Sequence, residues 1–336
     1  WYFYRYCDPK NEQAPFDPAT VRYWGPIDFY SGGVEHAILH LIYSRFFCKV
    51  LRDLGLVDHD EPFTRLLTQG MVLRNGAVMS KSKANVVDPD DMTAAYGADA
   101  LRLYEVFVAP PEKEIEWTDA GLEGSFRFLG RVWRLVRPFV ETFAAGSVPV
   151  PGAADLGDGD RAMRRKTHDT IRRVTTDLDP RVHLNTAVSA LMELVNEMYA
   201  YCERERIGPF APETSAVPRP AALAVAKEAV EVLVLLLSPF APHLAEELWE
   251  AIGHVDGVVA GGWPAFDPAV ARADEVVVPV QVNGKVRARL TVTAETSDDA
   301  LRELALVHPQ VEAHTSGKRI ARVVVVPRKL VNVVAR

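Results

Sequence analysis

The sequence predicts a chain of three parts: an α/β part over residues 1–117, an all-α helical bundle over residues 118–268, and a small α+β domain over residues 269–336. Three observations predict this fold class. Strand and helix patterns alternate in the first part, and apolar residues recur at helical spacing in the second. In the third, two pairs of short strand patterns flank one helix, which gives the order ββαββ.

Composition is ordinary for a globular protein, with 48% hydrophobic and 25% charged residues among 336. No apolar run approaches the about 20 residues that span a bilayer, and no signal peptide is visible, so we expect no membrane association. The three cysteines are widely spaced and form no C-x-x-C pair, which favours a reducing cytoplasm over a disulfide framework or a zinc site. Because the chain does not begin with Met, we interpret it as the C-terminal part of a longer protein.

The α/β part opens on an aromatic run, Trp1 to Tyr6, whose residue types are typical of a strand or of a core. Further on, residues 27–30 predict a buried strand, Gly32-Gly33 a turn, and residues 34–54 a helix. The helix prediction rests on apolar residues at helical spacing: Ala37, Ile38, Leu41, Ile42, Phe46 and Val50. Strand, glycine turn and helix in this order form the unit of a nucleotide-binding, Rossmann-like sheet.

A loop rich in lysine and serine follows in the same part. Residues 80–83, Ser-Lys-Ser-Lys, put two ammonium groups and two hydroxyls side by side, which suits a polyphosphate. Composition alone favours a solvated surface loop, since Lys/Ser loops of this kind are common. An Asn75-Gly76 turn precedes the loop, and Asp88-Pro89 predicts a capped helix start with Asp91 at capping-box spacing. We therefore expect a mobile loop that is anchored at its exit.

The bundle is predicted from apolar faces of helical period. One such face consists of Leu184, Ala187, Val188, Leu191, Leu194, Val195, Met198 and Cys202. Ser238-Pro239 breaks a helix and Pro242 opens the next, with Trp249 expected inside, while residues 146–159 form a loop. A basic cluster on another helix includes Arg164 and Arg165, which fits either a solvated face or contact with an RNA backbone.

The small domain begins with a hairpin. Residues 276–282 and 285–292 predict strands around Asn283-Gly284, and a helix is expected from Thr296 to about Val307. Residues 323–326 and 330–334 supply two more strands around Pro327-Arg328.

This domain is basic, with ten Lys/Arg against five Asp/Glu over residues 276–336, whereas the whole chain has a net charge of −7. Lys285, Arg287 and Arg289 alternate along one predicted strand, so we expect the three cations on one face. A solvated strand would explain them too, but three aligned cations favour contact with RNA.

Residues 69–102 resemble the second signature of class I aminoacyl-tRNA synthetases, the KMSKS loop. QGMV precedes the loop and YGADALR follows it, as in the members that activate aliphatic amino acids. The resemblance implies that Lys81 stabilises the ATP phosphates, with Ser80 and Ser82 as catalytic neighbours and Met79 in the ATP site. Val78 stands where a first lysine is usual, and Ala84 replaces a common glycine.

The segment GGVEHAILHLIY, from Gly32 to Tyr43, resembles the adenosine-binding segment of the same family in its leucyl form. The resemblance implies that Gly32 and Gly33 approach ATP and that Glu35 contacts its ribose. It also implies a leucine pocket formed by Tyr2, His36 and His40. The two histidines have the i, i+4 spacing of a metal pair as well, but the sequence shows no suitable third ligand, so we expect no metal.

The whole chain resembles the C-terminal portion of bacterial leucyl-tRNA synthetases, and residues 238–249 resemble their tRNA-binding helical domain. The resemblance implies activation of leucine by ATP with Mg²⁺, then transfer to tRNA(Leu), by a cytoplasmic monomer. The chain has no HIGH-type sequence and no editing insertion, so we expect it to be inactive alone. An isoleucyl, valyl or methionyl relative, or a non-catalytic RNA-binding protein derived from a synthetase, is the alternative.

Overall fold

The computed structural model describes residues 1–146, 148, 155–212, 217–271, 275–293, 296–326 and 329–335. The chain divides into two compact units: residues 1–151 with 170–264, and residues 152–169 with 265–336. The predicted α/β part and most of the predicted bundle thus belong to one unit, and the boundaries at residues 117 and 268 stay predictions. In the described ranges, no helix is long and apolar enough to cross a membrane.

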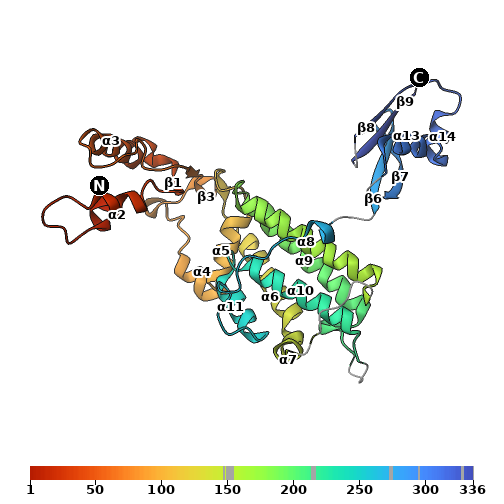
Figure 1. The fold of residues 1–336 in the computed structure, drawn as a ribbon, viewed down its shortest axis with the longest axis horizontal. Helices are drawn as coiled ribbons and strands as arrows, with labels where there is room; N and C mark the ends of the chain where they lie inside the picture. The colour runs from red at the N-terminus through yellow and green to blue at the C-terminus, as the bar shows by residue number, and fades with distance from the viewer. Residues whose placement is uncertain are drawn as a thin grey trace. The chain divides into compact units, whose positions relative to one another are not determined.

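Short elements alternate in the first part of the larger unit (Figure 1). In chain order they are α1 (Tyr2–Cys7), α2 (Pro18–Trp24), β1 (Tyr30–Gly33), the 3-10 helix η1 (Val34–Ile38), α3 (His40–Asp53), β2 (Leu66–Gln69), β3 (Val72–Arg74), β4 (Ala77–Val78), the 3-10 helix η2 (Lys81–Lys83), α4 (Pro89–Tyr96), α5 (Ala98–Phe107) and β5 (Ile115–Glu116). They form a parallel pair, β1-β2, and a three-stranded sheet of order β4-β3-β5.

The predicted strand over residues 27–30 with a turn at Gly32-Gly33 is wrong. Both glycines lie inside β1, which pairs in parallel with β2, whereas Ile27 makes only an isolated bridge with Phe63. Glycine lacks a Cβ atom and accepts extended and turned backbone alike, so its presence does not locate a turn. Here the parallel pairing with residues 66–69 holds both glycines in the extended conformation of a strand.

Two other predictions for this part also need correction. The aromatic run at the start is the helix α1, in which only Tyr4 is buried. The predicted helix over residues 34–54 is interrupted at Leu39, whose φ of −124° and ψ of −102° are not helical. Along α3, Leu41 is buried, but Ile42 and Phe46 are 50% and 62% exposed. The spacing of the apolar residues thus predicted helical structure, but it did not show which face of the helix would be buried.

The helical part of the larger unit agrees with the periodicity. Its elements are α6 (Asp119–Val136), η3 (Arg137–Phe139), α7 (Val140–Ala144), α9 (Leu184–Glu205), η5 (Gly208–Phe210), α10 (Pro220–Leu237) and α11 (Pro242–Ala251), and α8 (Asp158–Leu178) runs through both units. Helix α9 buries the predicted face from Ala187 to Cys202. The helix break before Pro242 and the buried Trp249 are confirmed. The predicted loop over residues 146–159 lies partly outside the described residues.

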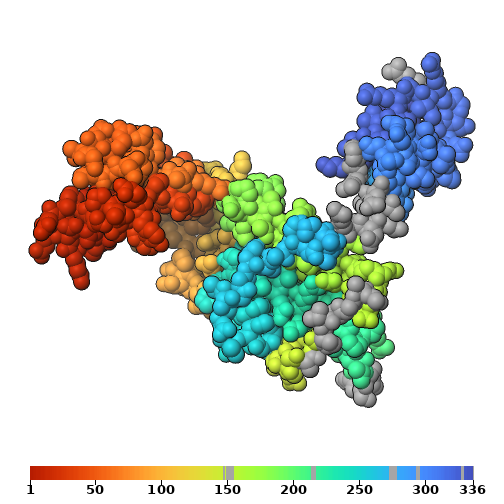
Figure 2. Space-filling view, viewed as in Figure 1, coloured from red at the N-terminus to blue at the C-terminus, as the bar shows by residue number. Residues whose placement is uncertain are grey.

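The small sheet of the second unit has the order β7-β6-β9-β8, with β6 and β9 parallel. Its elements are α12 (Pro268–Ala271), β6 (Glu275–Val282), β7 (Lys285–Thr293), α13 (Asp298–Leu306), α14 (Pro309–Thr315), β8 (Ile320–Val326) and β9 (Leu330–Ala335). The hairpin, the helix and the strands are as predicted, but α14 is an additional helix, so the order is ββααββ. Residues 327 and 328 lie outside the described residues. Both helices pack on the sheet and close an apolar core (Figure 1). Figure 2 shows the surface of this small domain in blue.

Candidate active site

The end of β1 carries the glycines and the carboxylate that the sequence predicted for ATP. Gly33 is the last residue of the strand, and the exposed Glu35 side chain in η1 turns back over it. A Cβ atom added to Gly33 would lie 2.2 Å from Glu35 Oε2, whereas one added to Gly32 would meet nothing within 4 Å. The Glu35 carboxylate therefore occupies the space that a side chain at position 33 would need, and it would have to move if residue 33 were not glycine.

The two predicted pocket histidines lie next to Gly32, Gly33 and the Glu35 carboxylate, which together form the glycine cradle. His36 belongs to η1 and His40 begins α3, and their ring centroids are 6.4 Å apart in an edge-to-face arrangement. A hollow of about 330 Å³ is lined by Tyr30, Ser31, Gly32, Gly33, His36, His40, Leu41 and Leu66. The structure thus brings together four predicted site residues. In the described ranges, no group of three or more His, Cys, Asp or Glu side chains is placed to hold a metal ion.

Tyr30 is a site residue that the sequence analysis missed. Its hydroxyl lies 2.5 Å from His40 Nε2, and its ring stacks on Phe63 with centroids 4.0 Å apart. Tyr30 also lines a second, aromatic pocket of about 600 Å³, together with Tyr2 and His40. Its position directly before Ser31 and the two glycines was the available signal. Tyr30 therefore connects the glycine cradle with the pocket predicted for leucine.

The buried Tyr4 and Cys48 line one part of the aromatic pocket. Tyr4, on α1, is 7% exposed, and its hydroxyl lies 2.7 Å from His59 Nε2 and 3.8 Å from Cys48 Sγ. Burial raises the pKa of the Tyr4 phenol and also that of the Cys48 thiol. Both groups are therefore neutral near pH 7.

The Lys81 loop leaves the β3-β4 hairpin at an exposed edge. Asn75 and Gly76 have φ of 56° and 70°, the left-handed pair of a tight hairpin turn, and Lys81 lies in the exposed 3-10 helix η2. The Ser80 and Ser82 hydroxyls lie 3.2 Å apart. Residues 79–82 line neither the hollow beside Gly33 nor the aromatic pocket of about 600 Å³. The phosphate loop and the glycine cradle are thus separate pieces of the predicted site.

The exit of this loop is capped as expected, with one difference. Asp88 caps α4, but its carboxylate accepts a hydrogen bond from the Asp90 N–H at 2.9 Å rather than from Asp91. The loop is also held at its entrance, because Asn85 Oδ1 accepts a hydrogen bond from the Ser80 N–H at 2.9 Å. Sequence reasoning missed Asn85, since its polar side chain reads as one more loop residue.

The predicted RNA-contacting arginines on α8 are not simple solvated cations. Arg164 and Arg165 are both half-buried, and both interact with other groups of the protein. Their contact with RNA stays a prediction.

The predicted alignment of three cations on β7 is wrong for one of them. Lys285 pairs with Val282, Val286 with Gln281 and Ala288 with Val280, which leaves Arg287 in a bulge. Directly paired residues of an antiparallel ladder share a face. Because Val282 and Ala288 are both buried, the register places Lys285 on the core face of the sheet, at the exposed end of β7. Arg289, paired with Pro279, lies on the outer face, and all three cations are exposed.

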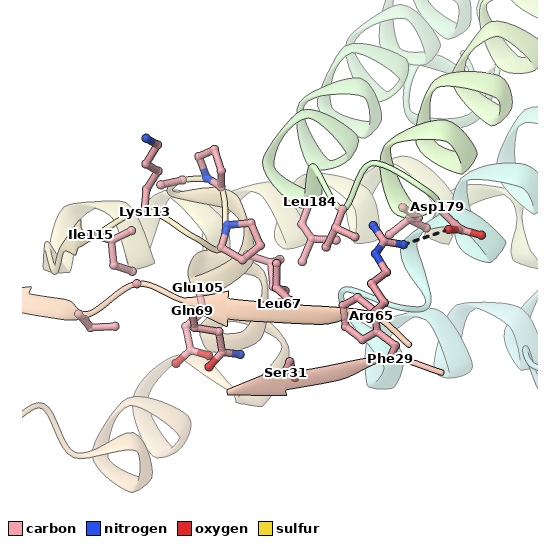
Figure 3. A pocket seen from close by; sticks show the side chains of 18 of the residues that line it. Phe29, Ser31, Arg65, Leu67, Gln69, Glu105, Lys113, Ile115, Asp179 and Leu184 are labelled. Carbon is pink, nitrogen blue, oxygen red and sulfur yellow. Dashed lines mark ion pairs between the residues drawn. The ribbon is translucent and has the colours of Figure 1, made fainter. Parts of the chain in front are cut away.

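A larger cavity, of about 840 Å³, lies on the opposite face of the β1-β2 pair (Figure 3). Leu67 and Gln69 line it, whereas Leu66 lines the hollow of the predicted site, as the alternation of strand residues requires, and Ser31 lines both. Arg65 Nη1 lies 3.6 Å from Asp179 Oδ1 on the cavity wall, and desolvation raises the pKa of Glu105, which also lines the cavity. Of the predicted site residues, none lines this cavity.

Two protein-family models match the chain. Residues 19–118 match the model described as tRNA synthetases class I (I, L, M and V), and residues 160–302 match the anticodon-binding domain of tRNA ligase. The leucine–tRNA ligase of Syntrophobacter fumaroxidans is 49% identical over 99% of this chain, and that of Alcanivorax borkumensis is 50% identical over 100%. In both cases the chain spans 39% of the relative's length.

Solved structures give the same assignment. The Agrobacterium radiobacter K84 AgnB2 LeuRS, in a ternary complex with tRNA and LeuAMS, superposes with a TM-score of 0.84 at 35% identity over 100% of this chain and 42% of that one. The methionyl-tRNA synthetase of Mycobacterium tuberculosis, at 22% identity and a TM-score of 0.58 over 76% of this chain and 49% of that one, shares the fold. The chain is therefore a member of the class I tRNA synthetase family and, over its whole length, a homologue of the leucine–tRNA ligases.

Proposed function

We propose that this chain supplies one part of the active site of a leucine–tRNA ligase, which activates leucine with ATP and transfers it to tRNA(Leu). One observation carries the proposal: the Glu35 carboxylate over Gly33 lies beside a hollow lined by His36 and His40. A carboxylate and exposed backbone at a strand end suit a ribose, and the adjoining aromatic pocket suits an aliphatic side chain.

The chemistry needs positioned cations more than covalent catalysis. Leucine attacks the α-phosphorus of ATP through its carboxylate, pyrophosphate leaves, and negative charge has to be stabilised along the phosphates. In this proposal the Lys81 ammonium supplies that stabilisation, with the Ser80 and Ser82 hydroxyls and Met79 beside it. Glu35 holds the ribose. Mg²⁺ prefers phosphate oxygens with few protein ligands, so we expect it to arrive with ATP.

The tRNA is the second substrate in this proposal. The AgnB2 LeuRS structure, which contains tRNA and LeuAMS, superposes on the whole of this chain. Arg164 and Arg165 in the anticodon-binding match, and Lys285, Arg287 and Arg289 on β7, are the proposed phosphate contacts. Phosphate contacts of this kind position an RNA without reading its sequence. We expect the complete enzyme to act as a monomer.

The test uses this chain joined to the amino-terminal part of the Syntrophobacter relative. We expect leucine-dependent exchange of pyrophosphate into ATP by the joined protein and none by the 336-residue chain alone. Lys81→Ala should lower the exchange rate on the order of 10²–10³-fold, because it removes one charge where negative charge develops. Lys10→Ala, an exposed lysine elsewhere, is the control. A loss of tenfold or less at Lys81 contradicts the assigned role.

A non-catalytic RNA-binding protein is the second candidate. Val78, 39% exposed, stands at the position of the usual first lysine and removes one cation from the loop. Binding of tRNA without any leucine-dependent exchange by the joined protein would favour this candidate.

A further inference from the structure

Asn85 makes more connections than any other side chain of the Lys81 loop for which the structure gives hydrogen bonds. It is 9% exposed, although residues 81–84 before it are exposed. Its Oδ1 accepts a hydrogen bond from the Ser80 N–H at 2.9 Å. Its Nδ2 lies 3.3 Å from the Arg74 carbonyl oxygen and 3.4 Å from those of Ala77 and Val78. One buried amide thus joins the hairpin to both ends of the loop.

The backbone between Ser80 and Asn85 forms a closed turn. The Lys83 N–H donates to the Ser80 carbonyl at 3.1 Å, and the Ala84 N–H donates to the Lys81 carbonyl at 3.2 Å. Ala84 adopts the left-handed conformation, with φ of 50° and ψ of 32°, which brings Asn85 back under the hairpin. The hairpin turn is itself held to β5, because the Gly76 N–H donates to Glu116 Oε1 at 3.1 Å.

We propose that Asn85 is a positioning residue that fixes the Lys81-Ser82-Lys83 turn against the β3-β4 hairpin, so that the Lys81 ammonium is presented in one place. The catalytic part of this inference rests on the proposed function of Lys81. The amide is suited to the task because its oxygen can accept from the Ser80 N–H while its nitrogen donates to the facing carbonyl oxygens. A carboxylate of the same shape would face those oxygens with no donor.

The structural part is tested on the 336-residue chain by amide hydrogen exchange over residues 77–85. We expect Asn85→Ala and Asn85→Asp to speed exchange at Ser80 and Lys83 by about tenfold each, because each loses hydrogen bonds of a buried group. Val86→Asp, which adds the same charge at a neighbouring residue that is 45% exposed, should leave these rates unchanged. Wild-type exchange in Asn85→Asp would show that the side chain only fills space and would overturn the proposal.

The catalytic part is tested by a double-mutant cycle in the joined protein. Asn85→Ala should lower the exchange of pyrophosphate about 10- to 100-fold while the KM for leucine stays the same. In a Lys81→Ala background the same change should cost less than about threefold, because Asn85 acts through Lys81. Equal losses in both backgrounds would overturn this role. If Lys81→Ala alone has no effect, the proposed function of Lys81 is wrong. The structural role of Asn85 is then decided by the hydrogen-exchange experiment alone.

Discussion

The Asp99 carboxylate accepts a hydrogen bond from the Leu244 N–H at 2.7 Å, across 145 residues of sequence. The same carboxylate lies 3.3 Å from the His243 N–H and 2.8 Å from His243 Nδ1. Helix α11 begins at Pro242, and Ala241 before it offers no capping side chain. Asp99 thus caps a helix from a distance and joins α5, which follows the Lys81 loop, to the bundle.

We predict that Asp99→Ala lowers the free energy of unfolding of the larger unit by about 2 kcal/mol, because the N–H groups at the start of α11 lose their acceptor. Asp99→Asn keeps one acceptor oxygen and should cost less. Urea unfolding followed by tryptophan fluorescence measures both values. Asp90→Ala, at an exposed position in α4, is the control and should change stability little. Equal stability of Asp99→Ala and Asp90→Ala would contradict the cap.

The bundle helix and the hairpin were predictable because their signals are local. Helix α9 buries the face that its spacing indicated, and Asn283 and Gly284 both adopt the positive φ that an Asn-Gly turn favours. The long-range contacts of Asp99 were not predictable, since nothing near Asp99 in the sequence names a partner 145 residues away. The bulge at Arg287 is a shift of one residue, which alternation alone does not reveal.

The candidate site was predictable in its residue types but not in its geometry. Gly33, His36 and His40 meet as expected, yet the glycine lies in a strand and the helix between the histidines is broken. The Glu35 side chain lies over Gly33, a contact that no local pattern indicates. The resemblance to a known family identified these residues, whereas their contacts with one another come from the structure.

Gly33→Ala should act through Glu35. The added Cβ would lie 2.2 Å from Glu35 Oε2, so the carboxylate has to move away from the strand end. We expect a higher KM for ATP in the joined protein from Gly33→Ala and from Glu35→Ala, and a smaller rise from Glu35→Gln, which keeps an acceptor oxygen. Adding Gly33→Ala to Glu35→Ala should have little further effect on that KM. Independent, additive losses would show that Gly33 contacts the nucleotide directly.

Ala84→Gly should stabilise the closed loop. An L-residue in the left-handed conformation costs about 1–2 kcal/mol, and glycine avoids most of this cost. We expect slower amide exchange at Lys83, by about fivefold, in the variant. Ala77→Gly, in the extended strand β4, should instead speed exchange, because glycine there only adds freedom to the open state. Faster exchange in both variants would mean that Ala84 is not strained.

The cations of β7 should divide into two groups in RNA binding. Arg289 lies on the outer face and Arg287 in the bulge beside it, whereas Lys285 belongs to the core face. Each phosphate contact that is lost should lower the slope of log Kd against log salt concentration by slightly less than one, because fewer counterions are released when tRNA binds. We therefore expect Arg287→Glu with Arg289→Glu to flatten the plot of log Kd against log salt by nearly two, and Lys285→Glu to change it less.

The control for this measurement is Arg302→Glu, at an arginine that pairs with Asp299 on α13 at 2.5 Å. Its charge change equals that of each single β7 variant, so a general field effect would appear in it equally. Retained pyrophosphate exchange in the joined protein would show that the fold and the catalytic part are intact. If the double variant binds tRNA as the unaltered protein does at every salt concentration, the outer face of β7 does not contact the RNA backbone.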